Sequence, residues 1–166
     1  PREIARPRLM RFPEVQGRSL SGEELNLPSD FPAAKTLCLI AFQQNHQGCV
    51  DRWIALAEAS GVPGSPVAMA SDDETCVLEI PVISTKWNLG RRFIDGGMTS
   101  SIKVPRVLAR TVTVYTDVGA LQRAMGIADS GVVQACVIAR DGSVMVRVPG
   151  EPTPGAWDAI AGALNT

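Results

Sequence analysis

The chain has 166 residues, of which 45% are hydrophobic and 20% are charged. This length suits one globular domain, and the composition excludes an intrinsically disordered chain. Lys and Arg number 16 against 17 Asp and Glu, so the net charge of −1 lacks the basic excess typical of nucleic-acid binding or of a polybasic membrane anchor. The longest near-continuous apolar run, residues 37–42, is far too short to span a bilayer.

The cysteines are spread along the chain without a CxxC pair, and His46 is the single histidine. Such a sparse set of ligands argues against structural zinc, and we expect neither a metal nor a cofactor. Cys38 and Cys136 lie in apolar, strand-like runs, where a free cysteine is usually a small buried hydrophobe. Cys76 lies in a polar approach to a strand, and Cys49 follows a polar loop.

Arginines and prolines dominate residues 1–11, which predicts a flexible N-terminal arm in front of one domain over residues 12–166. The chain begins at Pro1, so either an initiator methionine or a longer upstream piece has been removed. The start of the sequence contains no apolar targeting segment and does not decide targeting, so the location stays open, with the cytoplasm favoured. Residues 12–30 predict a small β-hairpin with Gly17 and Gly22 as turn points.

Predicted strands and helices alternate after the hairpin. Residues 36–42 form an uninterrupted apolar run, typical of a strand covered on both faces. Apolar residues at helical spacing predict a helix over residues 50–59. Residues 77–84 predict another strand, in which Pro81 indicates an edge position or a bulge. A second helix is predicted to place Leu89, Phe93 and Ile94 on one side and to end at Gly96 and Gly97.

The C-terminal third continues this alternation. Residues 111–116 predict a strand, and Asp117 is the expected N-cap of a helix over residues 118–125. Two apolar runs within residues 132–148 flank an Asp-Gly turn, which predicts a hairpin. A last helix begins at Thr153-Pro154. The order predicts a three-layer α/β sandwich with a mostly parallel sheet that the closing hairpin extends by antiparallel strands.

Four segments carry a family resemblance: VQGRSLSGEELNLP, TLCLIAF with the turn and helix after it, VTVYTDVGALQRAMGI, and VVQACVIARDGSVMVRVPG. In this order they resemble the thioredoxin superfamily, and within it the peroxiredoxin-like and membrane-anchored thioredoxin-like branches. The resemblance covers most of residues 12–164. It implies a thioredoxin-like sandwich with a central mixed sheet and an N-terminal β-hairpin extension. It also implies that the loop after the central strand and the start of the next helix form the active face.

Two features of thioredoxins are missing from the sequence. The loop after the central strand holds Cys49 alone in place of CxxC, which excludes dithiol exchange there. The family's cis-proline would fall near Val133, where the sequence has no proline. Both departures affect the groove in which a thioredoxin holds its substrate.

Cys49 is nevertheless the best candidate nucleophile. We expect it at or just before the first turn of the following helix, where the helix dipole lowers the pKa of a thiol. His46 would add a positive charge or a hydrogen bond, and His46-Gln47-Gly48-Cys49 partly resembles the T-x-x-C motif of peroxiredoxins. The guanidinium that such sites use would come from Arg91, Arg92, Arg110 or Arg147. The alternative is an ordinary, partly buried thiol.

The same loop also suits binding without reaction. Gln43, Gln44, Asn45 and Gln47 form with His46 an exposed, hydrogen-bonding segment. Amides in the place of thiols fit a surface that recognises a partner or a small ligand.

Two functions therefore stay open, and the sequence does not decide whether the protein is an enzyme. The first is a binding, scaffold or assembly module that uses the loop 43–49, as in the thioredoxin-fold assembly factor of the mitochondrial ATP synthase. The alternative is a single-cysteine thiol peroxidase or redox protein with Cys49 as nucleophile. The expected partners are another protein or an external thiol reductant, and the oligomeric state is open. No nucleotide-binding or nucleophile-elbow motif is present.

Overall fold

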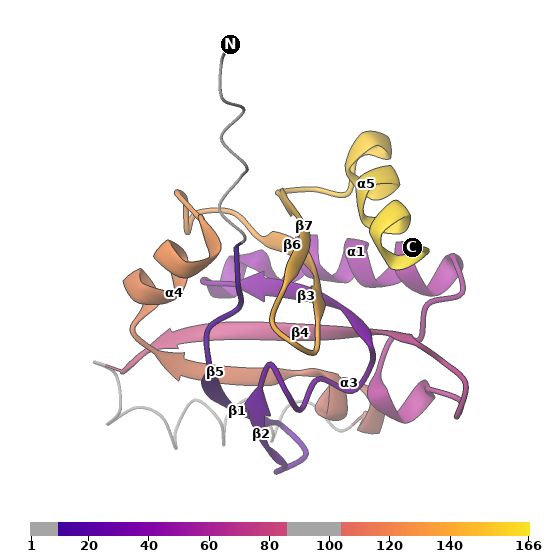
Figure 1. Cartoon of the computed structure of the whole chain (residues 1–166), viewed down its shortest axis with the longest axis horizontal. Helices are drawn as coiled ribbons and strands as arrows, with labels where there is room; N and C mark the ends of the chain where they lie inside the picture. Colours follow the sequence, from indigo (N-terminus) through magenta and orange to yellow (C-terminus); the bar gives the residue numbers. More distant parts are fainter. Residues whose placement is uncertain (1–9, 86–103) are drawn as a thin grey trace.

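A mixed β-sheet runs through the computed structural model, which describes residues 10–85 and 104–166 (Figure 1). The seven strands lie in the order β2-β1-β5-β4-β3-β6-β7. Only the β3–β4 and β4–β5 pairs are parallel within the described residues, so the expectation of a mostly parallel sheet is wrong. The strands are β1 (Val15–Ser19), β2 (Glu24–Leu27), β3 (Lys35–Ala41), β4 (Thr75–Ser84), β5 (Val112–Thr116), β6 (Gln134–Ala139) and β7 (Val144–Pro149).

Helices connect the strands and cover the sheet. They are α1 (Gln47–Ala59), α3 (Pro105–Arg110), α4 (Val118–Met125) and α5 (Pro154–Leu164), with the 3-10 turns η1 (Gln44–His46) and η2 (Pro66–Ala68). The sequence did not predict α3, whose six residues are too few for a recognisable apolar period. The helix predicted around Leu89, Phe93 and Ile94 lies outside the described residues. No described helix has both the length and the apolarity needed to cross a bilayer.

Local signals place α4 as the sequence predicts. The Asp117 carboxylate accepts a hydrogen bond from Ala120 N at 3.0 Å, which satisfies a backbone donor that the first turn of a helix leaves unpaired. Gly126 ends the helix with φ at +67°, a left-handed conformation that glycine adopts without strain.

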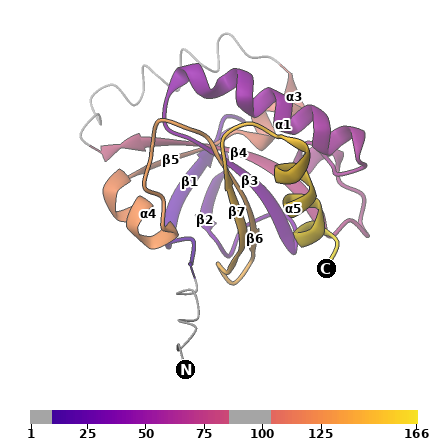
Figure 2. The ribbon, with the colours of Figure 1, turned by 90° about the horizontal axis from the view of Figure 1, so that it is seen from above.

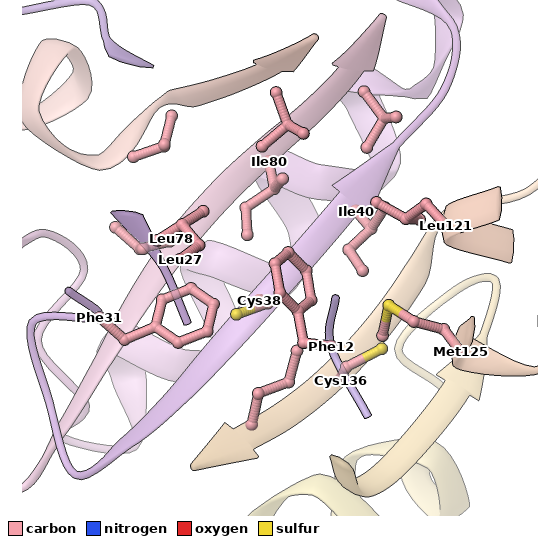
Figure 3. Close-up of a cluster of buried hydrophobic side chains, with 14 of the residues drawn as sticks. Phe12, Leu27, Phe31, Cys38, Ile40, Leu78, Ile80, Leu121, Met125 and Cys136 are labelled. Atoms are coloured by element: carbon pink, nitrogen blue, oxygen red, sulfur yellow. The ribbon is translucent and has the colours of Figure 1, made fainter. Parts of the chain in front are cut away.

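The core has two halves, one on each face of the sheet. Strand alternation sends Cys38 and Ile40 of β3 to one face and Leu37 and Leu39 to the other. The first face packs against α4 and against the aromatic side chains of Phe12 and Phe31, as Figure 3 shows. The second packs against α1 and α5, and Figure 2 shows α1 and α4 on opposite sides of the strands. The predicted burial of β3 on both faces is confirmed.

The N-terminal hairpin exists, but Gly17 is not at a turn. It lies within β1, between β2 and β5. A Cβ placed on Gly17 would lie 2.6 Å from Val112 Cγ1, so the close packing of β1 on β5 requires a residue without a side chain. Gly22 does occupy the turn, with φ at +98°, as predicted.

Two expectations about β4 are also wrong. Pro81 lies neither on an edge strand nor at a bulge, because β4 sits between β3 and β5 and its register with β3 reaches Pro81 without a shift. It is the last β4 residue paired with β3, and on the other side it lies between the parallel bridge Glu79–Thr111 and the first β5 pair at Val82. Cys76 is not in a polar approach to the strand: it belongs to β4 and is fully buried.

Met10 and Arg11, just before the N-terminal hairpin, contact the start of β7 at the opposite edge of the sheet. Val144 N donates a hydrogen bond to Met10 O at 3.0 Å, and Arg11 pairs with Ser143 in an isolated antiparallel bridge. Asp141-Gly142 makes the predicted turn between β6 and β7, with Gly142 at φ +92°. The rest of the predicted arm lies outside the described residues.

Candidate functional site

The candidate loop joins β3 to α1 at the carboxyl end of the parallel strands. The turn η1 occupies Gln44–His46, and α1 begins at Gln47, three residues before the predicted start at Val50. Cys49 is therefore a first-turn residue of α1 with a half-buried side chain. The structure thus places it where the resemblance implied.

His46 is buried beneath the loop rather than exposed on it, with 6% of its surface accessible. Its Nδ1 accepts a hydrogen bond from Phe42 N at 3.2 Å, so the ring proton belongs on Nε2. Nε2 then donates to the Gly131 carbonyl at 3.1 Å. Both ring nitrogens are bonded to backbone groups, which leaves neither for the Cys49 thiol.

The loop amides divide into two groups. Gln43, Gln44 and Asn45 are exposed, and their side chains have no hydrogen-bond partner within the described residues. Gln47 is different, because its Nε2 donates to Asp51 Oδ1 at 2.8 Å and to Glu79 Oε1 at 2.9 Å. Within the described part of the chain, the amides of Gln43, Gln44 and Asn45 are therefore unpaired, and the amide of Gln47 is part of the protein's own hydrogen-bond network.

The surroundings of Cys49 disfavour its thiolate. Burial is the main cause that raises the pKa of the Cys49 thiol above its ordinary value, and the negative charge of Glu151 raises it further. The positive charge of Arg52 acts in the opposite direction without cancelling these effects. The thiol donates to the Gly150 carbonyl at 3.5 Å. The pKa of Cys49 is therefore shifted upward, opposite to the lowering expected at the start of a helix, with burial as the largest cause and Glu151 next.

The segment between β7 and α5 lies against the first turns of α1. Trp53 Nε1 donates to Gly150 O at 2.8 Å, and Gly150 N donates to Val133 O at 2.8 Å. An ion pair joins Arg52 to Glu151, with Nε 2.7 Å from Oε2. These contacts fix a carbonyl and a carboxylate beside the sulfur of Cys49, and both favour its protonated form.

The guanidinium groups proposed from the sequence are committed elsewhere or not described. Arg110 Nε lies 3.0 Å from Glu79 Oε2, and Arg110 Nη1 donates to the Gly64 carbonyl at 3.2 Å. Arg147 donates to Gln134 Oε1 at 2.8 Å. Arg91 and Arg92 lie outside the described residues.

The sequence reasoning overlooked Glu79. This carboxylate lies inside an otherwise apolar run, and a charge in a buried strand is a signal that a partner must exist. Its partners are the Arg110 guanidinium, the Thr111 hydroxyl at 3.2 Å and the Gln47 amide. Across residues 10–85 and 104–166, no three His, Cys, Asp or Glu side chains gather closely enough to hold a metal ion.

Comparison with known proteins shows similarity in structure alone. No protein-family model matches the chain, and no curated protein matches its sequence. The structure resembles BsSco, of the Sco family of cytochrome c oxidase assembly proteins, with a TM-score of 0.59, 9% identity and coverage of 99% of this chain and 97% of BsSco. It also resembles the exposed lipoprotein thioredoxin Etrx1 from Streptococcus pneumoniae, with a TM-score of 0.58, 14% identity and coverage of 92% and 98%.

A third similar structure is a putative electron transfer protein from Aquifex aeolicus, with a TM-score of 0.58, 11% identity and coverage of 95% of this chain and 96% of that protein. At such identities the matches establish architecture and not activity. The mixed sheet, the helices on both faces and the N-terminal hairpin together make this a thioredoxin-like fold.

Proposed function

We propose that this thioredoxin-fold protein is a non-covalent binding module, serving as a scaffold or in assembly, and that the loop 43–49 is its recognition surface. One observation carries the proposal: buried His46 holds the loop from beneath, while the amides of Gln43, Gln44 and Asn45 face outward without partners in the described residues. The buried histidine keeps the loop in one conformation, and the exposed amides offer hydrogen-bond donors and acceptors that a partner can use.

The anchor lowers the entropic cost of binding. His46 N also donates to Gln43 O at 3.1 Å, so the backbone of η1 is fixed before a partner arrives. A preordered loop loses less conformational entropy on binding than a flexible one. Primary amides offer a donor and an acceptor on each side chain, which complements the peptide groups of a partner protein.

The surroundings of Cys49 support a function without thiol chemistry. The Gly150 carbonyl and the Glu151 carboxylate stabilise the protonated thiol, and the protonated thiol is a poor nucleophile. An assembly role also suits this architecture, since the Sco family, described as assembly proteins of cytochrome c oxidase, has a similar fold.

The alternative is a peroxiredoxin-like thiol peroxidase in which Cys49 attacks peroxide and an external thiol restores it. The position of Cys49 in the first turn of α1, half-buried, favours this alternative. Against it, Arg110 and Arg147 are both bonded to other groups, so neither is free to stabilise the Cys49 thiolate.

The test compares three variants of the tagged full chain by affinity capture and mass spectrometry. Alanine at Gln43, Gln44 and Asn45 together should abolish capture of specific partners without changing the melting temperature. The matched control replaces one glutamine and two asparagines elsewhere on the surface, Gln16, Asn26 and Asn165, and should keep capture. Cys49→Ser should also keep it.

Two results would contradict the proposal. Capture by the loop variant equal to that of the wild type would place the recognition surface elsewhere. Peroxide consumption by the wild type that Cys49→Ser abolishes would favour the peroxidase.

A further inference from the structure

His46 joins the recognition loop, residues 43–49, to two other parts of the chain. The ring is buried. Its Nδ1 accepts from Phe42 N, just after β3, and its Nε2 donates to Gly131 O, between α4 and β6. This pair of bonds exists only while the ring is neutral and carries its proton on Nε2. The conformation of the loop therefore depends on the charge of one side chain.

A second proton on the ring removes the bond to Phe42. Protonated Nδ1 is a donor, and it would face the Phe42 N–H, whose nitrogen lies 3.2 Å away when the ring is neutral. Two donors at this distance repel each other. Nε2 remains a donor and keeps its bond to Gly131. The charged ring therefore satisfies only one of its two contacts.

Within the described residues, no carboxylate is bonded to the imidazole, because both ring nitrogens bond to backbone groups. The titratable and charged groups in the first turns of α1, on β4, at the start of α4 and between α4 and β6 are each bonded to other atoms. They are Cys49 with Gly150 O, Asp51 with Gln47 Nε2, Arg52 with Glu151, Glu79 with Arg110, Asp117 with Ala120 N, and Asp129 with Gly131 N. A buried imidazolium without a bonded counter-charge is costly. Protonation therefore favours a ring that has left its site and reached water.

We propose that His46 is a proton-controlled anchor of the recognition loop. The neutral ring holds the loop closed. When Nδ1 takes up one proton from water, the ring leaves Phe42 and the loop opens, and no covalent bond other than this N–H is formed. The inference rests on the proposed function and adds its regulation. An open loop no longer holds Gln43, Gln44 and Asn45 in a fixed arrangement, so a partner binds more weakly in acid.

The size of the effect follows from proton linkage. Imidazole normally changes charge between about pH 5 and 8, and His46 is the single histidine of the chain. An exposed imidazole has a pKa of about 6.5, and only the open loop exposes the ring to protons from water. The ratio of open to closed loops should therefore rise about 30-fold between about pH 7.5 and 5.0.

The test is amide hydrogen exchange of the ¹⁵N-labelled full chain, measured by NMR at pH 7.5 and pH 5.0. Each rate is compared with that of an unstructured peptide at the same pH, which gives the protection of each amide. The protection of the Phe42 amide should fall about 30-fold in acid. The amide of Leu39, inside β3, should stay better protected than that of Phe42 at both pH values, because the opening is local.

The matched control is His46→Asn. Its Oδ1 takes the place of Nδ1 as the acceptor for Phe42 N but binds no proton in this pH range, so the fall in Phe42 protection should be absent. His46→Gln replaces it if that variant does not fold. Ring ¹⁵N spectra of the wild type give a second readout: Nδ1 should gain its proton over the same pH range in which the Phe42 amide loses protection.

Three results would overturn the anchor. They are equal changes of Phe42 protection in the wild type and the control variant, a charged ring with full Phe42 protection, and equal partner capture at pH 5.0 by the wild type and the control variant. The proposed function fails separately. If the Gln43, Gln44 and Asn45 alanine variant keeps capture at pH 7.5, the loop is not the recognition surface, whereas the exchange rates still decide whether a proton on His46 opens it.

Discussion

The buried ion pair between Glu79 and Arg110 allows a test of how much a buried, unpaired charge lowers the free energy of unfolding. The side chains of these residues expose only 7% and 10% of their surface. Arg110→Met keeps most of the side-chain length and removes the charge. It leaves the Glu79 carboxylate buried with the Gln47 amide at 2.9 Å and the Thr111 hydroxyl at 3.2 Å as its remaining partners.

The expected loss of stability follows from these partners. Removing one member of a buried pair costs roughly 3–5 kcal/mol, since it leaves an uncompensated charge. The Gln47 amide still donates to Glu79, and the single proton of the Thr111 hydroxyl is shared between Glu79 and the Val107 carbonyl at 2.8 Å, so we expect the lower end, about 3 kcal/mol. A domain is stable by roughly 5–15 kcal/mol in total. With a urea slope of roughly 1–3 kcal/mol per molar, the unfolding midpoint should fall by about 1–3 M.

The assay is urea unfolding of four proteins: wild type, Arg110→Met, Glu79→Leu and the double variant. Replacing both partners by apolar groups removes the unpaired charge, so the double variant should lie within about 1–2 kcal/mol of the wild type. A double variant as unstable as the sum of the single variants would refute this reasoning, because it would show that packing, rather than an unpaired charge, causes the loss.

Three further predictions concern Cys49, Cys136 and Gly17. Glu151→Gln should speed iodoacetamide alkylation of Cys49 several-fold at pH 7, because the carboxylate raises the pKa of the thiol; an unchanged rate, with Cys49→Ser as blank, would contradict this effect. Burial raises the pKa of Cys136 from 9.0 to about 12. Unfolded chains therefore lose a proton above pH 9 that native chains keep, and stability should fall by about 1.4 kcal/mol per pH unit through this thiol until about pH 12. Cys136→Ala should show a correspondingly smaller alkaline slope. Gly17→Ala should lower stability by about 1–3 kcal/mol in urea unfolding, because its Cβ would meet Val112; an unchanged midpoint would show that β1 can shift.

Features encoded by neighbouring residues could be predicted from the sequence. The apolar run of β3, the Asp117 cap of α4 and the Asp141-Gly142 turn each depend on residues a few positions apart. Their order along the chain was enough to predict the three-layer architecture. The strand directions were predicted less well, because the position of β5 beside the antiparallel strand β1 is not encoded in either segment alone.

The chemistry of the candidate site depends on distant residues. His46 bonds to a carbonyl 85 positions away, and Cys49 bonds to one 101 positions away. A local pattern can place a cysteine at the start of a helix, but the carboxylate beside its sulfur comes from another part of the chain. This is why the position of Cys49 could be predicted and the direction of its pKa shift could not.

Gln47 connects the buried charges to the recognition loop. Its amide reaches Glu79 from the first turn of α1, so the ion pair fixes the end of the loop as well as the sheet. In the Glu79→Leu and Arg110→Met double variant, stability returns but Gln47 loses this partner. The double variant should then be nearly as stable as the wild type but have a less ordered loop. A buried pair that adds little net stability would be retained because it specifies one position of the loop, and a preordered loop is what a non-covalent binding surface requires.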